Sequence, residues 1–358
     1  MIPLYKPYMP DLPLLDKIIH SGHIAAGEWT NKFENELKRF IGVNNLIVTS
    51  SFNTAISVAI TTLGLNYGDE VIASPMACLA STQPYLCEGL NVKWADIDPS
   101  TGTLNPDDVK KRITSKTKLI IHNHFCGYVG YVDEINKIAK DNGIYVIDDG
   151  IECFGSEYKN KLIGNVDTDI TIFSFNPVRV LTTIDGGCVI FKNKELYDKS
   201  MLVRDCGIDR TKFRDDLGEI NPNCDISVKG YSATLSNVNA YIGFEELKGI
   251  DERLKKQREN ALEWDHILSN EVENKKYGLE RIDIKNTNPN YWIYGLLTNN
   301  KNDMINMFRN KGYYSSTVHI NNNIYSIFNK QETLKGVKKF VSSFLALPCG
   351  WWVYKIKL

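Results

Sequence analysis

Residues 173–187, FSFNPVRVLTTIDGG, form the stretch that decides the fold. The stretch begins as an apolar strand, breaks at Asn176-Pro177, and continues after Asp185-Gly186-Gly187 into the β-prone run CVIF at 188–191. An irregular polar turn between two buried strands is a common place for chemistry, because its side chains are free of the sheet yet rigidly supported. Taken alone, however, the segment is best interpreted as a simple connection between strands.

The length and composition are those of a globular α/β protein. The chain has 358 residues, of which 43% are apolar and 24% charged. This is enough for a large domain, which we expect at residues 1–245, and a smaller one at 246–358. Lys and Arg together number 42 and Asp and Glu 43, giving a net charge of -1. We therefore expect no nucleic-acid partner.

The N-terminus and the cysteines predict a cytoplasmic protein. Residues 1–6, MIPLYK, lack a basic region followed by an apolar run, and no segment is long and apolar enough to cross a bilayer. We therefore expect no membrane partner. The eight cysteines contain no Cys-x-x-Cys pair and mostly lie in apolar runs. This pattern predicts reduced core residues, with neither a disulfide framework nor a metal site.

Strands alternate with helices through the first half of the chain. The strand runs lie at 46–50, 70–73, 92–96, 118–122 and 144–147, and helical patterns lie at 53–63, 78–87 and 132–140. A further helix is expected between Thr30, as its N-cap, and Gly42. This spacing predicts an α/β fold with a doubly wound, mostly parallel sheet that has helices on both faces.

The second half of the chain predicts a small α+β C-terminal domain. A long helical pattern at 235–268 leads into it. Apolar runs at 291–297 and 312–319 are then expected to form strands around a helix at 303–309.

Polar side chains follow three of the predicted parallel strands. Asp148 and Asp149 lie at one strand end, His122 and His124 at a second, and residues 174–179 at a third. Each group taken singly is better explained as a cap or a structural histidine. Because ligands of such sheets bind beyond the carboxyl ends of the strands, the three groups together predict a polar pocket.

The strand at 46–50 runs directly into a helix and could provide an anion site. Unpaired N–H groups and the helix dipole converge at a helix N-terminus. Phe52 and Asn53 occupy the positions where a phosphate site prefers Gly, which lets the backbone approach a ligand closely. These two residues favour an ordinary connection between strand and helix.

The order of several short motifs resembles a known family. The motifs are Ser21-Gly22-His23-Ile24 with Gly27 and Phe33-Glu34, Gly68-Asp69-Glu70-Val71, Asp96-Ile97-Asp98, His124-Phe125-Cys126-Gly127, Asp148 to Gly155, Ser174 to Pro177 with Thr182 to Gly187, Arg204-Asp205-Cys206-Gly207, and Ala240-Tyr241-Ile242-Gly243. Over nearly its whole length, the chain resembles the nucleotide-sugar aminotransferases of the DegT/DnrJ/EryC1/StrS type. The resemblance implies the aspartate aminotransferase fold, pyridoxal phosphate (PLP), and nucleotide-linked keto sugars used mostly for surface polysaccharides. It also implies a homodimer with shared sites.

Carried over position by position, the resemblance shows both retained and altered site residues. The family's Schiff-base lysine falls on Arg179, whose guanidinium stays protonated and cannot take that role. Asp149, the partner of the pyridinium nitrogen, and Ser174, a phosphate ligand, are retained. The altered positions are Phe52 and Asn53 for the Gly-Thr phosphate cradle, Leu79 for the stacking aromatic, Ser232 for an asparagine from the neighbouring subunit, Asn176 for a histidine, and Glu152 for a glutamine.

Three hypotheses follow from these substitutions. In the first, the protein has lost PLP and catalyses an epimerase-like or isomerase-like reaction on a nucleotide-linked keto sugar. Glu152, His124 or His319 would then supply the acid and base, and Arg179 would stabilise an enolate. In the second, PLP or its amine form PMP binds without a covalent link, as in the family's dehydratase branch.

The third hypothesis is a non-catalytic protein that binds a sugar nucleotide or pairs with an active paralogue. Arg179 would hold a phosphate or carboxylate in bidentate fashion. The first and third hypotheses rank nearly level and above the second, so we expect no cofactor. A visible absorption band on mixing with PLP would contradict that expectation.

Overall fold

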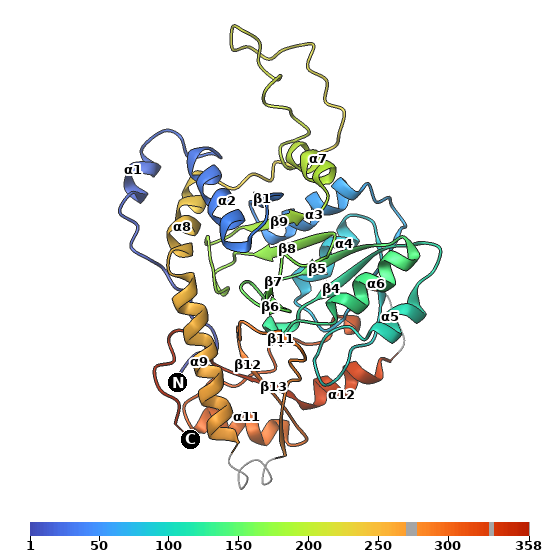
Figure 1. Ribbon diagram of the computed structural model, residues 1–358, viewed down its shortest axis with the longest axis vertical. Coiled ribbons are helices and arrows are strands. Elements are labelled where there is room, and N and C mark those ends of the chain that lie inside the picture. Colours follow the sequence, from blue (N-terminus) through green and yellow to red (C-terminus); the bar gives the residue numbers. More distant parts are fainter. Residues whose placement is uncertain (270–277, 329–332, 358) are drawn as a thin grey trace.

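A seven-stranded sheet lies at the centre of the computed structural model, which describes residues 1–269, 278–328 and 333–357 (Figure 1). The strands lie in the order β1-β9-β8-β5-β4-β2-β3, and only β9 runs antiparallel to its neighbours. Their bounds are β1 Leu46–Thr49, β2 Glu70–Ala73, β3 Asn91–Trp94, β4 Thr117–Asn123, β5 Tyr145–Asp149, β8 Ile170–Ser174 and β9 Gly187–Phe191. The predicted α/β fold with a mostly parallel sheet is confirmed.

Both faces of the sheet are buried, as the apolar strand runs require. Ile121 and Ile147 face the main hydrophobic core, whereas Ile120 and Val146 face a separate apolar cluster on the other side. The helices around the sheet are α2 Glu28–Ile41, α3 Phe52–Leu63, α4 Gln83–Cys87, α5 Pro106–Arg112, α6 Val132–Asn142 and α7 Lys194–Arg204. Successive side chains of β4 and β5 therefore point into two different apolar clusters, one on each face of the sheet.

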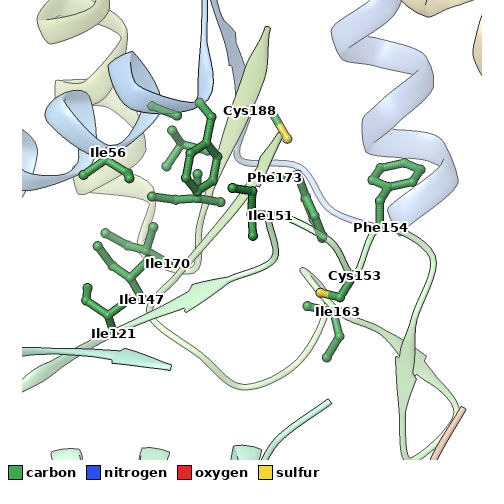
Figure 2. Close-up of a cluster of buried hydrophobic side chains, with 14 of the residues drawn as sticks. Ile56, Ile121, Ile147, Ile151, Cys153, Phe154, Ile163, Ile170, Phe173 and Cys188 are labelled. Carbon is green, nitrogen blue, oxygen red and sulfur yellow. The ribbon is translucent and has the colours of Figure 1, made fainter. Parts of the chain in front are cut away.

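The main core packs tightly beneath the turn that follows β8. Phe173 on β8 contacts Phe154 edge to face at 5.3 Å and lies near Ile151 (Figure 2). A Cβ atom on Gly187, the first residue of β9, would lie 3.0 Å from the carbonyl oxygens of both Phe173 and Ser51. The absence of a side chain at Gly187 therefore lets β8, β9 and the start of α3 lie close together.

Helix α2 begins earlier than its sequence predicts. Gly27 is the N-cap, so the prediction that Thr30 is the cap is wrong. Thr30 lies inside the first turn, where its Oγ1 accepts a hydrogen bond of 3.2 Å from the Gly27 N–H. Gly42 ends the helix in the left-handed conformation (φ 81°), as predicted.

Two predicted helices are divided in the structure. The pattern at 235–268 forms α8 Asn237–Leu247 and α9 Ile250–Leu268, with a break at Lys248 and Gly249. The pattern at 78–87 forms a 3-10 helix, η1 Leu79–Ser81, followed by α4. No helix within the described residues has the length and apolar character needed to cross a membrane.

The C-terminal part of the chain forms a small sheet in the order β10-β12-β13. Its elements are β10 Leu279–Arg281, β12 Tyr294–Thr298, α11 Lys301–Asn310, α12 Lys335–Ser343 and β13 Phe344–Leu347. The predicted strand at 312–319 is not formed, because its described residues make isolated bridges only, to Ile2 and Ala346. Trp264 of α9 packs with Phe308 and Tyr294 in a separate apolar cluster here. The domain division at residue 245 stays a prediction.

The remaining short elements connect the two parts of the chain. A second three-stranded sheet joins β11 Thr287–Asn288 to β6 Glu157–Tyr158 and β7 Lys161–Leu162. The N-terminal helix α1 Leu15–Ile19 packs against α8. These contacts join segments that are distant in the sequence.

Candidate functional site

A cavity of about 580 Å³ lies where β8 ends and α3 begins. Six sequence-predicted site residues line it, namely Phe52, Asn53, Ser174, Asn176, Arg179 and His319. The other lining residues are Tyr5, Ser51, Cys78, Ala80, Ile151, Val178, Asp185, Trp292 and Val318. A pocket therefore lies beyond the strand ends, but of the three groups predicted to form it only residues 174–179 contribute to its lining.

The turn that carries Arg179 is held by its own hydrogen bonds. The Arg179 N–H donates to the carbonyl of Asn176 at 3.0 Å, and the Thr183 N–H donates to the carbonyl of Phe175 at 2.9 Å. The Thr182 hydroxyl donates to the same Phe175 carbonyl at 3.0 Å. The segment is thus a fixed turn that presents Arg179 to the cavity.

Arg179, Glu152 and His319 form a buried network. Arg179 Nη1 donates to Glu152 Oε1 at 3.3 Å, and His319 Nε2 donates to the same oxygen at 2.7 Å. The Cys126 N–H donates to Glu152 Oε2 at 2.9 Å. The Glu152 side chain is 2% exposed and that of Arg179 is 8% exposed. Three of the four predicted catalytic residues are therefore brought together.

The pKa of Glu152 lies below its ordinary value. Burial alone would raise this pKa, because it disfavours the charged carboxylate. The neighbouring His319 and Arg179, together with the Cys126 N–H, outweigh burial and lower it. Glu152 is therefore a carboxylate that orients His319 and Arg179.

The start of α3 offers hydrogen-bond donors to an anion. Ser51 caps the helix, with its Oγ accepting from the Thr54 N–H at 3.1 Å. Among the described residues, the N–H groups of Phe52 and Asn53 have no hydrogen-bond acceptor. Ser174 lines the same cavity. Free N–H groups at a helix N-terminus beside a hydroxyl suit a phosphate group.

Asp149 is a buried carboxylate that does not line this cavity but lies two residues from Ile151, which does. Its two oxygens accept from the Asn123 side chain at 2.9 Å and from the Ile151 N–H at 3.0 Å. Burial raises the pKa of Asp149. No Lys, Arg or His in the described part of the chain forms an ion pair with it. A cationic ring nitrogen would supply that missing partner, so Asp149 and the start of α3 together fit the PLP group.

His124, predicted as an acid or base, does not reach the cavity. His122 and His124 lie on the opposite face of the sheet from Asp149, where His122 Nδ1 donates to Asp148 Oδ1 at 2.9 Å. His124 Nε2 lies 3.4 Å from the same oxygen, and its Nδ1 accepts from the Gly130 N–H at 3.2 Å. Both rings are fully buried. They stabilise the Asp148 carboxylate, and the acid or base role of His124 stays a prediction.

Leu79 and Ser232 also lie outside the cavity lining. Leu79 begins η1, between Cys78 and Ala80, which do line it. Ser232 is exposed and pairs with Asp205 in an isolated bridge. It belongs to the long segment between α7 and α8, part of which projects from the body of the molecule (Figure 1). The roles predicted for these two positions stay predictions.

Two aromatic residues of the site were not predicted from the sequence. The rings of Tyr5 and Trp292 stack at 4.6 Å, and the guanidinium of Arg179 lies 4.9 Å from the centre of the Trp292 ring. Tyr5 is at the N-terminus, and Trp292 lies in an aromatic run, YWIYG, that suggested only a buried strand. No local signal places either residue beside Arg179.

The fold and the site define an aspartate-aminotransferase-like protein. The family model for the DegT/DnrJ/EryC1/StrS aminotransferase family matches residues 10–351, so the chain belongs to this family. GDP-perosamine synthase of Escherichia coli O157:H7 is 30% identical over 302 residues, covering 83% of this chain and 78% of that protein. The crystal structure of the sugar aminotransferase CalS13 from Micromonospora echinospora gives a TM-score of 0.91 at 24% identity, covering 99% and 96% of the two chains. The predicted family is thus confirmed.

The expectation that the protein has no cofactor is wrong. The family to which the chain belongs is an aminotransferase family, whose chemistry depends on PLP and PMP. A further structural neighbour, Spr1654 from Streptococcus pneumoniae, has been solved in a PMP form and a PLP form, with TM-scores of 0.86 and 0.85 and 20% and 19% identity. Both alignments cover 98% of this chain; they cover 94% of the PMP-form chain and 93% of the PLP-form chain. The PLP-independent epimerase hypothesis therefore loses its support.

Proposed function

We propose that this protein processes a nucleotide-linked sugar and holds PLP or PMP in the cavity without a covalent bond. The observation that carries the proposal is Arg179, which lies in the turn after β8, while no lysine lines the cavity among the described residues. Asp149 would face the ring nitrogen, and Ser174 with the start of α3 would hold the phosphate. The name of the GDP-perosamine synthase relative supports a nucleotide sugar as the substrate class.

The bound group would supply an electron sink or an amino group, and the chain would supply proton transfer. We infer that His319 is the proton-transfer residue, because Glu152 fixes its Nε2. In the described structure, His319 Nδ1 has no hydrogen-bond partner, so this atom can take up or release a proton. Arg179 keeps its proton and instead stabilises negative charge beside the reacting atoms.

A second candidate is a non-catalytic protein that binds a sugar nucleotide. The observation that favours it is again Arg179, whose guanidinium cannot provide the amine nucleophile. Its ion pair with Glu152 could serve recognition alone. Both candidates share the same cavity, so catalysis itself must be measured.

Cofactor binding tests the first candidate. Purified protein would be titrated with PMP and with PLP and followed by absorption. It would then be reduced with borohydride and analysed by intact mass. Saturable binding with no mass increase is expected, and Arg179→Lys is expected to gain the mass of one reduced cofactor with PLP. A mass increase in the unaltered protein, or no binding of either compound, would overturn the proposal.

Proton exchange separates the two candidates. Protein loaded with PMP would be incubated in D₂O with UDP-, dTDP- and GDP-linked keto sugars, and sugar protons would be followed by NMR. Exchange that is lost in His319→Asn supports the enzyme. Cofactor and sugar binding without exchange or product would leave the non-catalytic protein.

We also propose a cytoplasmic homodimer whose subunits share their sites. The support is limited to the family and to the exposed position of Ser232, which falls where the family places a residue of the neighbouring subunit. All eight cysteines, which lie in the described part of the chain, are free, as a reducing compartment requires. Sedimentation would test the dimer.

A further inference from the structure

We propose that Arg179 binds a carboxylate on the sugar, so that the substrate is a nucleotide-linked uronic acid. This inference rests on the proposed function, because it requires a nucleotide sugar to enter the cavity. It goes further by naming which sugars the site selects. The argument depends on the hydrogen bonds, the packing and the charge around Arg179.

The guanidinium of Arg179 has more donors than the described residues use. A guanidinium carries five N–H donors in a planar fork. The contact with Glu152 at 3.3 Å is long for a charged hydrogen bond. The Nε atom is buried and has no partner among the described residues. Because buried polar groups are normally satisfied, these donors indicate a ligand that occupies the cavity.

The position of Arg179 is fixed before any ligand binds. Its guanidinium packs 4.9 Å from the centre of the Trp292 ring. Trp292 is itself held, because its Nε1 donates to the Val178 carbonyl at 2.7 Å and its ring stacks on Tyr5. A guanidinium that is already ordered loses little entropy on binding an anion.

The carboxylate beside Arg179 is shared. A single oxygen of Glu152, Oε1, accepts from both Arg179 and His319. Asp185 also lines the cavity, but it is exposed and its Oδ1 accepts from the Gly186 N–H. One further oxyanion would complete the network.

A carboxylate matches this site better than a phosphate does. The start of α3 and Ser174 already provide the phosphate site of the cavity. A planar carboxylate offers two oxygens at the spacing of the guanidinium fork. The oxyanion could also come from the cofactor or from the diphosphate of the nucleotide, and the experiment therefore separates these sources.

The test compares acidic sugars with their neutral counterparts on full-length protein saturated with PMP. Calorimetric titrations would use UDP-glucuronate against UDP-glucose, and GDP-mannuronate against GDP-mannose. UDP and GDP alone report the diphosphate, and PMP alone reports the cofactor. In at least one series, the acid should bind roughly 10- to 100-fold more tightly than the neutral sugar, the range of a charged hydrogen bond.

Variants show whether Arg179 is responsible. Arg179→Met should bring the ratio of the two affinities close to one. The matched control, Arg39→Met, removes an exposed arginine paired with Glu36 and should leave the ratio unchanged. The inference would be overturned if the acidic and neutral sugars bind with equal affinity in both series, or if neither acid binds. It would also be overturned if Arg179→Met still binds the acid more tightly than the neutral sugar. If PMP alone or the free nucleotides bind less tightly by the same factor in Arg179→Met, the oxyanion belongs to them and the inference also fails. PMP binding to the unaltered protein, measured separately, would still support the proposed function.

Discussion

Replacing Glu152 by Gln tests whether the buried network is held together by charge. Glu152 accepts from Arg179, His319 and the Cys126 N–H, and its side chain is 2% exposed. Removing one partner of a buried ion pair costs about 3–5 kcal/mol. The amide oxygen of Gln recovers about 1 kcal/mol through a neutral hydrogen bond. By subtraction, the free energy of unfolding should fall by about 2–4 kcal/mol.

Scanning calorimetry near neutral pH measures this loss. An unfolding entropy of about 2.1 cal/mol/K per residue amounts to about 0.75 kcal/mol/K for this chain. The Tm of Glu152→Gln should therefore fall by about 3–5 °C. In the double variant with Arg179→Met, the unpaired guanidinium is gone, so the Tm should be higher than in Glu152→Gln alone.

An exposed ion pair provides the control. Glu36→Gln breaks a surface contact with Arg39, whose side chain is 80% exposed, and should change the Tm by less than about 1 °C. The reasoning is refuted if Glu152→Gln behaves like Glu36→Gln. It is also refuted if the effects of Glu152→Gln and Arg179→Met simply add, because the two residues would then not be coupled.

Three further predictions concern the same region. The pKa of Glu152 is lower in the folded chain than its ordinary 4.5, so its contribution to stability is present above that pH and is lost as the pH falls below it. Glu152→Gln should therefore flatten the fall of Tm with acid, measured against the unaltered protein; parallel curves would contradict this. Asp149→Asn removes the charge proposed to face a ring nitrogen and should weaken PMP binding by about 10- to 100-fold in an absorption titration; equal affinities would show that Asp149 is a structural residue. Gly187→Ala places a methyl group 3.0 Å from the Phe173 and Ser51 carbonyls and should lower stability by about 1–3 kcal/mol in calorimetry, whereas an unchanged Tm would mean that the backbone moves freely there.

The sequence predicts the large sheet well because its signals are local. Each strand is a short apolar run bounded by turn residues, and the runs alternate with helical patterns. The turn at 173–187 was predicted for the same reason. Boundaries that depend on neighbouring elements were predicted less well. Thr30 lies within α2, and the break between α8 and α9 leaves the apolar pattern at 235–268 unchanged.

The face on which a side chain lies could not be predicted in this sheet. Strands buried on both sides have no alternation of polar and apolar residues. His124 and Asp149 both follow apolar runs, yet they lie on opposite faces of the sheet. Neither of them lines the cavity, although Asp149 lies two residues from Ile151, which does.

Contacts between distant parts of the chain were also beyond the sequence. Glu152 and His319 are separated by 167 residues, and their contact depends on how the C-terminal segment returns to the large sheet. Tyr5 reaches Trp292 in the same way. Family resemblance located Glu152, but only the fold shows that it orients His319.

Two groups of residues beside the cavity differ in how they are satisfied, and this difference bears on function. Asp149 accepts hydrogen bonds but has no cationic partner among the described residues, and the first N–H groups of α3 have no acceptor there. Arg179, Glu152 and His319, the second group, already contact one another. A lysine at position 179 would supply an amine but would lose the guanidinium fork and its contact over the Trp292 ring. Arg179 is therefore integrated with its neighbours, as expected if the site has been adapted to use the arginine itself.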